Sequence, residues 1–214
     1  MDWVIVAGAC FVAGLLNAVA GGGSFITLPA LMIVGLPPVV ANATGTAALL
    51  PGYIASVWRF RKDIVLPAGL GLSTVTALTI AGGTLGATIL LVSSEQLFAS
   101  LIPWLILFAT LAFIISPKIV ALKTGGEPAT LTALRRRALA TSIGLFFLCV
   151  YGGYFNGGLG IILLAALSLL GQSNLRGMNG LKNGLSALLT AVAVSVYALG
   201  DAISLKYLFV AGVS

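Results

Sequence analysis

The stretch GLLNAVAGGGS, residues 14–24, interrupts an apolar segment with three consecutive glycines and a serine. A related stretch, NGGLG at residues 156–160, interrupts a second apolar segment. A shift of 137 residues (158 minus 21) superimposes Gly21 on Gly158. Interrupted hydrophobic segments at corresponding positions of two halves indicate the substrate site of a transporter built from repeats. We therefore expect an internal duplication.

The same shift superimposes two polar pairs. Asn42 and Thr46 fall on Asn179 and Asn183, and each pair stands near the start of a long apolar run. Residues four apart share one helix face, and Ser186 and Thr190 continue the second pair. In lipid such a stripe must point inward. It lines a pocket, or it forms interhelical hydrogen bonds.

The composition places the chain in a membrane. Of its 214 residues, 59% are hydrophobic and 7% are charged, and the mean hydropathy is +1.14. Soluble domains carry about 25% charged residues. Continuous apolar runs favour helices over a barrel. We therefore expect an all-α integral membrane protein.

Several kinds of site are not expected. The sequence has no histidine, and its two cysteines, Cys10 and Cys149, lie inside apolar runs. We therefore expect no metal, no cofactor and no disulfide framework. The net charge of +6 is carried mainly by loop Lys and Arg, which set topology and do not indicate nucleic-acid binding.

Two of the apolar runs are too short to cross a membrane, which takes about 20 residues. Because each follows a glycine cluster, we expect each cluster to be the tip of a re-entrant or broken helix hairpin, followed by transmembrane helices. The expected runs are Trp3–Ala20, Phe25–Gly35, Val39–Trp58, Ile64–Val92, Leu97–Ile115, Ala138–Phe155, Ile161–Leu170, Met178–Leu199 and Leu205–Val213.

Basic residues predict how the halves are oriented. Clusters at residues 59–62 and 118–137 mark cytoplasmic loops. Counting membrane spans backwards from the first cluster places the N-terminus outside. Counting forwards from the second cluster, the second hairpin enters and leaves on the cytoplasmic side, where it ends at Arg176. The prediction is two inverted-topology repeats, residues 1–123 and 133–214, with a linker at 124–132. The short last run predicts that the second repeat is truncated at its C-terminus.

The glycine clusters are candidate anion sites. A helix that begins inside the membrane presents free N–H groups and a positive dipole end, and glycine allows close approach. Ser24 adds a hydroxyl. The alternative is that these glycines only let helices pack closely. The candidate residues are Gly21, Gly22, Gly23, Ser24, Gly158 and Gly160.

Lys182 is the most unusual single residue, because it lies about one turn inside an apolar run. An intramembrane cation indicates a functional site, and an anionic substrate would be its counter-ion. The alternative is snorkelling to the interface. All five carboxylates fall at run ends or in loops, so proton coupling is not supported. Asn17, Tyr154 and Asn156 precede the tips, where they reach the same cavity or cap the hairpins.

These residues resemble the TauE/SafE sulfite exporter family, which includes permeases of the 4-toluene sulfonate uptake type. The likeness is carried by residues 14–24, by LPAL at 28–31, and by Gly35 and ANAT at 41–44. The second half departs from it, since Ala166 stands in the place equivalent to Pro29. The resemblance implies transport of sulfite, sulfoacetate or other organosulfonates across a bacterial inner membrane.

The predicted function is a multi-pass permease or exporter of a small sulfur-containing anion, working by alternating access. Its partners would be that anion and the lipid bilayer, without nucleic acid, and a homodimer stays open. An anion channel and a non-transporting scaffold are the alternatives. An intramembrane enzyme is not expected, because no acid, base or metal constellation lies in mid-membrane.

Overall fold

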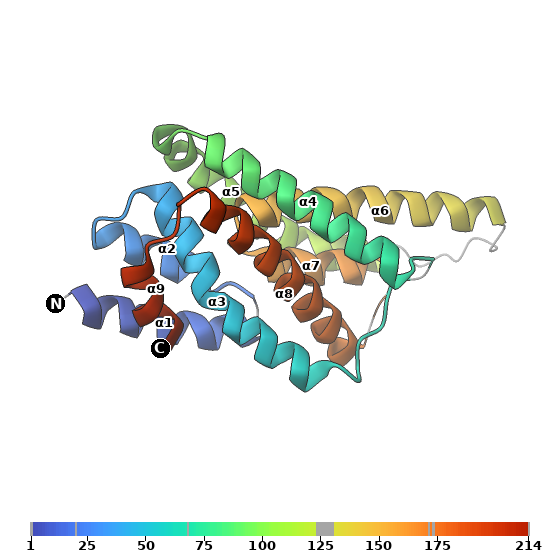
Figure 1. Ribbon diagram of the computed structural model, residues 1–214. Helices are drawn as coiled ribbons and strands as arrows, with labels where there is room; N and C mark the ends of the chain where they lie inside the picture. The colour runs from blue at the N-terminus through green and yellow to red at the C-terminus, as the bar shows by residue number, and fades with distance from the viewer. Residues whose placement is uncertain are drawn as a thin grey trace.

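The computed structural model describes residues 2–19, 21–67, 69–122, 131–170, 172 and 174–213. Every regular element in this part of the chain is an α-helix (Figure 1). The helices are α1 (Asp2–Val19), α2 (Ser24–Ile33), α3 (Pro38–Phe60), α4 (Leu72–Val92), α5 (Glu95–Leu122), α6 (Leu131–Tyr154), α7 (Leu159–Leu169), α8 (Leu175–Leu199) and α9 (Leu205–Val213).

Four helices of the described chain are long and apolar enough to cross a membrane, by length and composition. They are Leu72–Val92, Glu95–Ala112, Arg135–Tyr154 and Leu175–Leu199. Shorter apolar helices cover Trp3–Ala18, Ser24–Ile33 and Leu159–Leu169. The all-α, membrane-protein prediction is therefore confirmed, as are the two short helices after the glycine clusters.

Three predicted boundaries are wrong. Helix α5 continues to Leu122 and does not end at Ile115, so residue 118 is helical rather than part of a loop. Helix α4 begins at Leu72 and not at Ile64, because Pro67 and the glycines at 69 and 71 keep the preceding apolar residues out of the helix. Helix α6 begins at Leu131, so residues 135–137 are helical rather than part of a loop. Arginine is a good helix former, and a helix does not end where apolarity ends. Of the predicted linker, 124–130 lie outside the described residues.

Each glycine cluster turns the chain back on itself. Gly21 has φ +85° and Gly158 has φ +73°, backbone conformations that glycine adopts without strain. The first turn joins α1 to α2, and the second joins α6 to α7. In Figure 1, α1 starts at the end of the molecule marked N, whereas α6 starts at the opposite end. The two hairpins thus approach the middle of the molecule from opposite ends.

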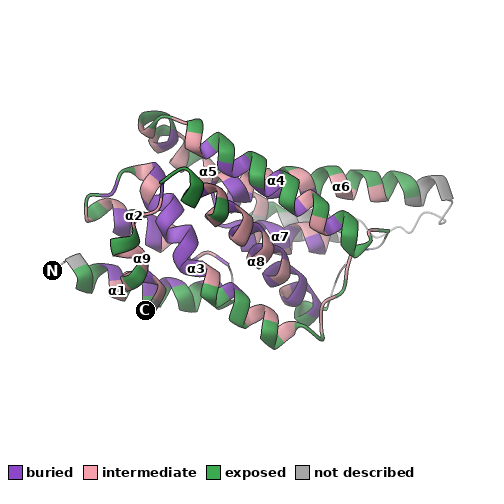
Figure 2. Cartoon of the chain, in the orientation of Figure 1, coloured by how far each residue is buried: buried purple, intermediate pink, exposed green. Residues whose placement is uncertain are grey.

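The long helices surround these hairpins. Helix α3 packs against α8, while α4 packs against both α6 and α8, and α5 packs against α7. Helix α9 contacts α1 and α3. Burial is concentrated in α3, α7 and α8, whereas α1 and α6 show long exposed stretches (Figure 2). Large exposed apolar side chains, such as Phe11, Phe108 and Phe147, suit a lipid-facing surface.

The α4–α6 contact depends on glycine. Gly82 and Gly86 are four residues apart, the spacing that lets membrane helices approach closely. A Cβ added at Gly82 would lie 2.7 Å from Cys149 Cβ and 2.8 Å from the Phe146 carbonyl oxygen. Close packing therefore accounts for these glycines, which lie away from the hairpin tips.

Candidate substrate site at the glycine tips

The two glycine clusters touch each other. A Cβ added at Gly21 would lie 2.5 Å from Gly160 Cα, closer than real Cβ contacts come. A Cβ at Gly22 would lie 3.5 Å from the Ile161 side chain. Segments that sequence reasoning related only by similarity are thus neighbours in space. The tips of both hairpins form one structure.

Other glycines of the clusters are required for packing. A Cβ at Gly23 would lie 2.6 Å from the carbonyl oxygen of Ala13 in α1, against which the turn packs. A Cβ at Gly158 would lie 2.7 Å from the Phe25 ring and 2.8 Å from Ala109. The close-packing alternative therefore applies to Gly23 and Gly158, whatever else they do.

Helices α3 and α8, which are hydrogen-bonded to residues beside the second tip, carry buried polar side chains. On α3 these are Asn42 and Thr46, and on α8 they include Asn183, Ser186 and Thr190. The stripe arises because helix periodicity repeats these residues every three or four positions. Since α3 and α8 pack against each other, both stripes turn away from lipid.

Hydrogen bonds connect the long helices to the hairpin tips. Asn42 Nδ2 donates to the Tyr154 carbonyl oxygen at 3.2 Å, so α3 holds the end of α6. Tyr53 donates its hydroxyl to Asn17 Oδ1 at 3.2 Å. Asn156 Nδ2 donates to Thr190 Oγ1 at 3.3 Å.

The last two hydrogen bonds occupy equivalent positions on the long helices. Tyr53 on α3 becomes Thr190 on α8 after the 137-residue shift (53 plus 137 is 190). Tyr53 bonds Asn17 in the last turn of α1, and Thr190 bonds Asn156, two residues after the end of α6. The shift places Asn17 on Tyr154 and not on Asn156 (17 plus 137 is 154), so the two hydrogen bonds are similar in place but opposite in direction.

Several buried polar atoms of α2, α3, α8 and the second tip have no protein partner. Among the described residues, the unpaired atoms with almost no exposed surface are Thr27 Oγ1, Thr46 Oγ1, Asn156 Oδ1, Asn179 Oδ1, Lys182 Nζ, Asn183 Nδ2 and Ser186 Oγ. A buried polar group without a partner costs about 1–3 kcal/mol. Such groups are rare in native proteins, and a cluster of them indicates a bound ligand or water.

Lys182 is the only charged residue among the buried polar side chains of the described chain. It is the eighth residue of α8, and its side chain is 0% exposed. Its Nζ has no hydrogen-bond partner. Snorkelling requires the ammonium to reach the interface, and this conformation keeps it inside. The ammonium is therefore available to a ligand.

The remaining predicted residues differ in their surroundings. Ser24 is buried at the first position of α2. Asn179 is partly exposed, and its Nδ2 donates to the Leu175 carbonyl at 3.1 Å. The Tyr154 hydroxyl accepts a 3.5 Å bond from Ser93, at the end of α4. Tyr154 therefore contributes its backbone carbonyl to the cluster, while its ring points to the α4–α5 end.

Sequence reasoning missed Thr27 and Tyr53. Thr27 lies one turn after Ser24, and its hydroxyl is buried and unpaired. Tyr53 is 1% exposed and lies eleven residues after Asn42, about three helical turns along the same face. Extending the Asn42–Thr46 stripe by further turns finds Tyr53.

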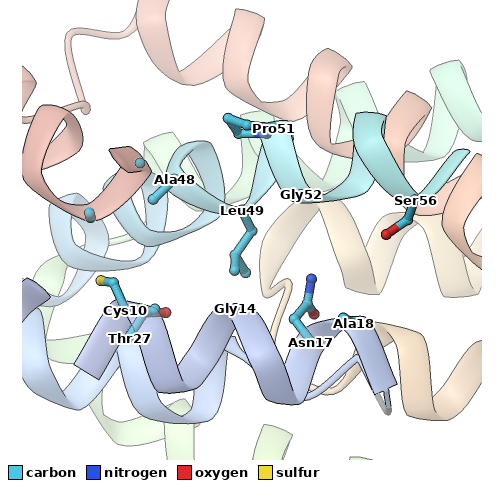
Figure 3. Close-up of a pocket in the computed structure, with 12 residues that line it drawn as sticks. Cys10, Gly14, Asn17, Ala18, Thr27, Ala48, Leu49, Pro51, Gly52 and Ser56 are labelled. Carbon is cyan, nitrogen blue, oxygen red and sulfur yellow. The ribbon is translucent and has the colours of Figure 1, made fainter. Parts of the chain in front are cut away.

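A cavity of about 170 Å³ borders the first hairpin. It lies between α1 and α3, and Asn17 and Thr27 are among its lining residues (Figure 3). Gly14 and Ala18 also line it. The equivalent positions of the second half hold Tyr151 and Phe155, larger side chains that pack against α5 and the second tip. The two halves therefore differ in how open the hairpin is.

A multi-pass helical membrane protein with a buried, unpaired polar cluster at helix breaks has the features of a membrane transporter. The family model of the sulfite exporters TauE/SafE matches residues 6–214, and the chain belongs to this family. The family description and the names of its relatives are those of transporters and not of enzymes.

Relatives are found in several bacteria. A probable membrane transporter protein of Haemophilus influenzae is 32% identical over 166 residues, which cover 75% of this chain and 60% of that protein. The probable membrane transporter protein ORF9 of Sinorhizobium is 30% identical over 111 residues, 51% of this chain and 41% of the relative. The probable membrane transporter protein YfcA of Escherichia coli K12 is 31% identical over 108 residues, 50% and 39%. The chain spans 60% or less of these relatives' length, and no solved structure matches it.

Proposed function

We propose that this chain forms a permease for a small sulfur-containing anion, sulfite or an organosulfonate, in a bacterial inner membrane. The anion binds where the two glycine tips meet and crosses by alternating access. The N-terminus lies outside. The substrate class comes from the family's description as sulfite exporters.

The observation that carries this proposal is the set of buried, unpaired polar atoms that includes Lys182 Nζ. An oxyanion accepts hydrogen bonds from ammonium, amide and hydroxyl groups, and Lys182, Asn183 and Ser186 offer one of each. Charge-assisted hydrogen bonds are about twice as strong as neutral ones. A bound anion would therefore satisfy groups that the protein leaves without partners.

Alternating access is supported by the correspondence of the two halves. Helix α3 begins at Pro38 and α8 at Leu175, 137 residues later (175 minus 38). Helix α4 contacts α6 and α8, as α9 contacts α1 and α3. We interpret these matches as two inverted repeats whose tips share one site. Rocking of one repeat against the other would expose that site to each side in turn.

Uptake into proteoliposomes tests the proposal. Purified protein is reconstituted and supplied with sulfite, sulfate, thiosulfate or methanesulfonate, and we expect saturable uptake of sulfite or the sulfonate. Lys182→Ala should lower uptake at least tenfold. The matched control is Lys206→Ala, which removes an exposed lysine of α9 that lies over the Trp3 ring.

Three outcomes separate the alternatives. Uptake that does not saturate with anion concentration would support the anion channel. Uptake unchanged in a folded Lys182→Ala variant would move the site elsewhere. Absence of uptake and of binding for every anion tested would leave the scaffold alternative.

A further inference from the structure

In the proposed site, Lys182 supplies one positive charge. Its Nζ is buried and unpaired. The polar residues one turn away on the same side of α8, Asn179 and Ser186, are neutral, and so is the adjacent Asn183. The empty site therefore carries the charge of a single ammonium.

The carboxylates of the chain lie at helix ends. Asp63 is in the turn after α3, and Asp201 follows α8. Glu95 is the first residue of α5, where its Oε2 accepts a 2.7 Å hydrogen bond from the Val39 backbone N–H. Asp2 begins α1, while Glu127 lies outside the described residues. The sequence contains no histidine.

We propose that the site is electrically neutral in the step that carries a bound monoanion across the membrane. In the step that returns the empty site, it carries one positive charge. This inference rests on the proposed function. The charges balance over one cycle: one anion leaves, Lys182 keeps its proton, and no proton or metal ion accompanies the anion. Net transport therefore moves one negative charge per anion.

This charge assignment determines which step the membrane potential acts on. The neutral, loaded site does not respond to the potential, whereas return of the empty, positive site does. A potential that is negative inside drives anions outward. Exchange of one anion for another uses only loaded steps, so it should not respond to the potential.

Proteoliposomes with a potassium gradient and valinomycin test this prediction. The probes are radiolabelled methanesulfonate and, in mildly acidic buffer, sulfite, which is then mainly the hydrogen sulfite monoanion. One elementary charge gains about 2.3 kcal/mol per 100 mV, so the steady-state accumulation ratio should change about 50-fold per 100 mV. Exchange rates measured with equal unlabelled anion on both sides should stay within about twofold of one another across these potentials.

Lys182→Gln locates the charge. Its loaded site would carry the anion's negative charge and its empty site none, so anion exchange becomes sensitive to potential. Lys182→Arg keeps the charge and should keep exchange insensitive. Lys206→Gln removes a charge outside the site and is the matched control, with the wild-type pattern expected.

The outcomes are distinct from failure of the proposed function. If neither anion is taken up, the proposed function fails and this inference fails with it. If uptake occurs but the accumulation ratio of the anion does not change with the membrane potential, or changes with a proton gradient instead, the permease function stands and the charge assignment is overturned. The charge assignment would also be overturned if exchange by the wild-type protein depended on the potential as strongly as net uptake does. This measurement needs no variant.

Discussion

The Cα atom of Gly160 occupies the space that a side chain at Gly21 would need, since a Cβ there would lie 2.5 Å away. The contact joins the turn of the first hairpin to the start of α7 in the second. Because Gly21 also has φ +85°, both its backbone conformation and its surroundings require glycine.

Gly21→Ala should be strongly destabilising. The left-handed conformation costs a non-glycine residue about 1–2 kcal/mol, and overpacking adds about 1–3 kcal/mol. We expect the free energy of unfolding to fall by about 2–5 kcal/mol, measured by thermal unfolding in detergent. Gly35→Ala is the control, because Gly35 has φ +94° and nothing within 4 Å of an added Cβ. Equal losses for the two variants would contradict the tip contact.

Thr46→Val should make the protein more stable while weakening anion binding. The Thr46 hydroxyl is buried and unpaired, so its removal relieves a penalty of about 1 kcal/mol. Stability gained at the expense of function is typical of a binding site. The measurements are the melting temperature and anion affinity of purified protein.

Thr79→Val is the matched control for that substitution. Thr79 is also buried, but its hydroxyl donates to the Val75 carbonyl at 2.8 Å. We expect no gain in stability and no change in anion affinity. Stabilisation by both substitutions would mean that burial of a threonine, and not its missing partner, is responsible.

Tyr53→Phe should loosen the first hairpin. It removes the hydroxyl that bonds Asn17 Oδ1 at 3.2 Å and leaves that buried oxygen without this partner. Hydrogen bonds between membrane helices average about 0.6 kcal/mol and reach about 1–2 kcal/mol, so we expect a loss in that range. Thr190→Val, which removes the Asn156 partner, should cost a similar amount. A loss in only one half would contradict equivalent roles.

Glu95→Ala should destabilise the start of α3. The Glu95 carboxylate accepts the Val39 N–H at 2.7 Å, and a carboxylate at a helix N-terminus contributes about 1 kcal/mol. Glu95→Gln keeps an acceptor and should lose about half as much. The exposed neighbour Gln96 provides the control, since Gln96→Ala should leave the unfolding temperature unchanged.

Most of the fold was predictable because lipid imposes strong rules on sequence. The run predicted at Leu205–Val213 coincides with α9, and the short runs after the glycines match α2 and α7 within two residues. The errors at Ile64 and Arg135 share one cause: hydropathy shows which residues tolerate lipid, whereas helix ends depend on proline, glycine and propensity. The apolar residues at 64–66 are therefore outside helix α4.

The sequence predicts which polar residues share a helix face at the site, but it does not predict their hydrogen-bond partners on other helices. The spacing of Asn42 and Thr46 shows that they share a face, and both are buried. Spacing does not show that Tyr154 would turn its hydroxyl towards Ser93, because that depends on a contact between distant helices. The meeting of Gly21 with Gly160 likewise depends on the whole packing arrangement.

The hydrogen-bonded tips also bear on how such a chain evolves. After a gene segment duplicates, its copies are usually free to diverge, whereas the two copies of the proposed duplication face each other at a contact with no room for a side chain. The residue types tolerated at position 21 depend on the residue at position 160, and those tolerated at position 160 depend on the residue at position 21. We therefore expect mutations in one half to be tolerated or rejected according to the state of the other, so that the two copies share a single evolutionary history at their centre.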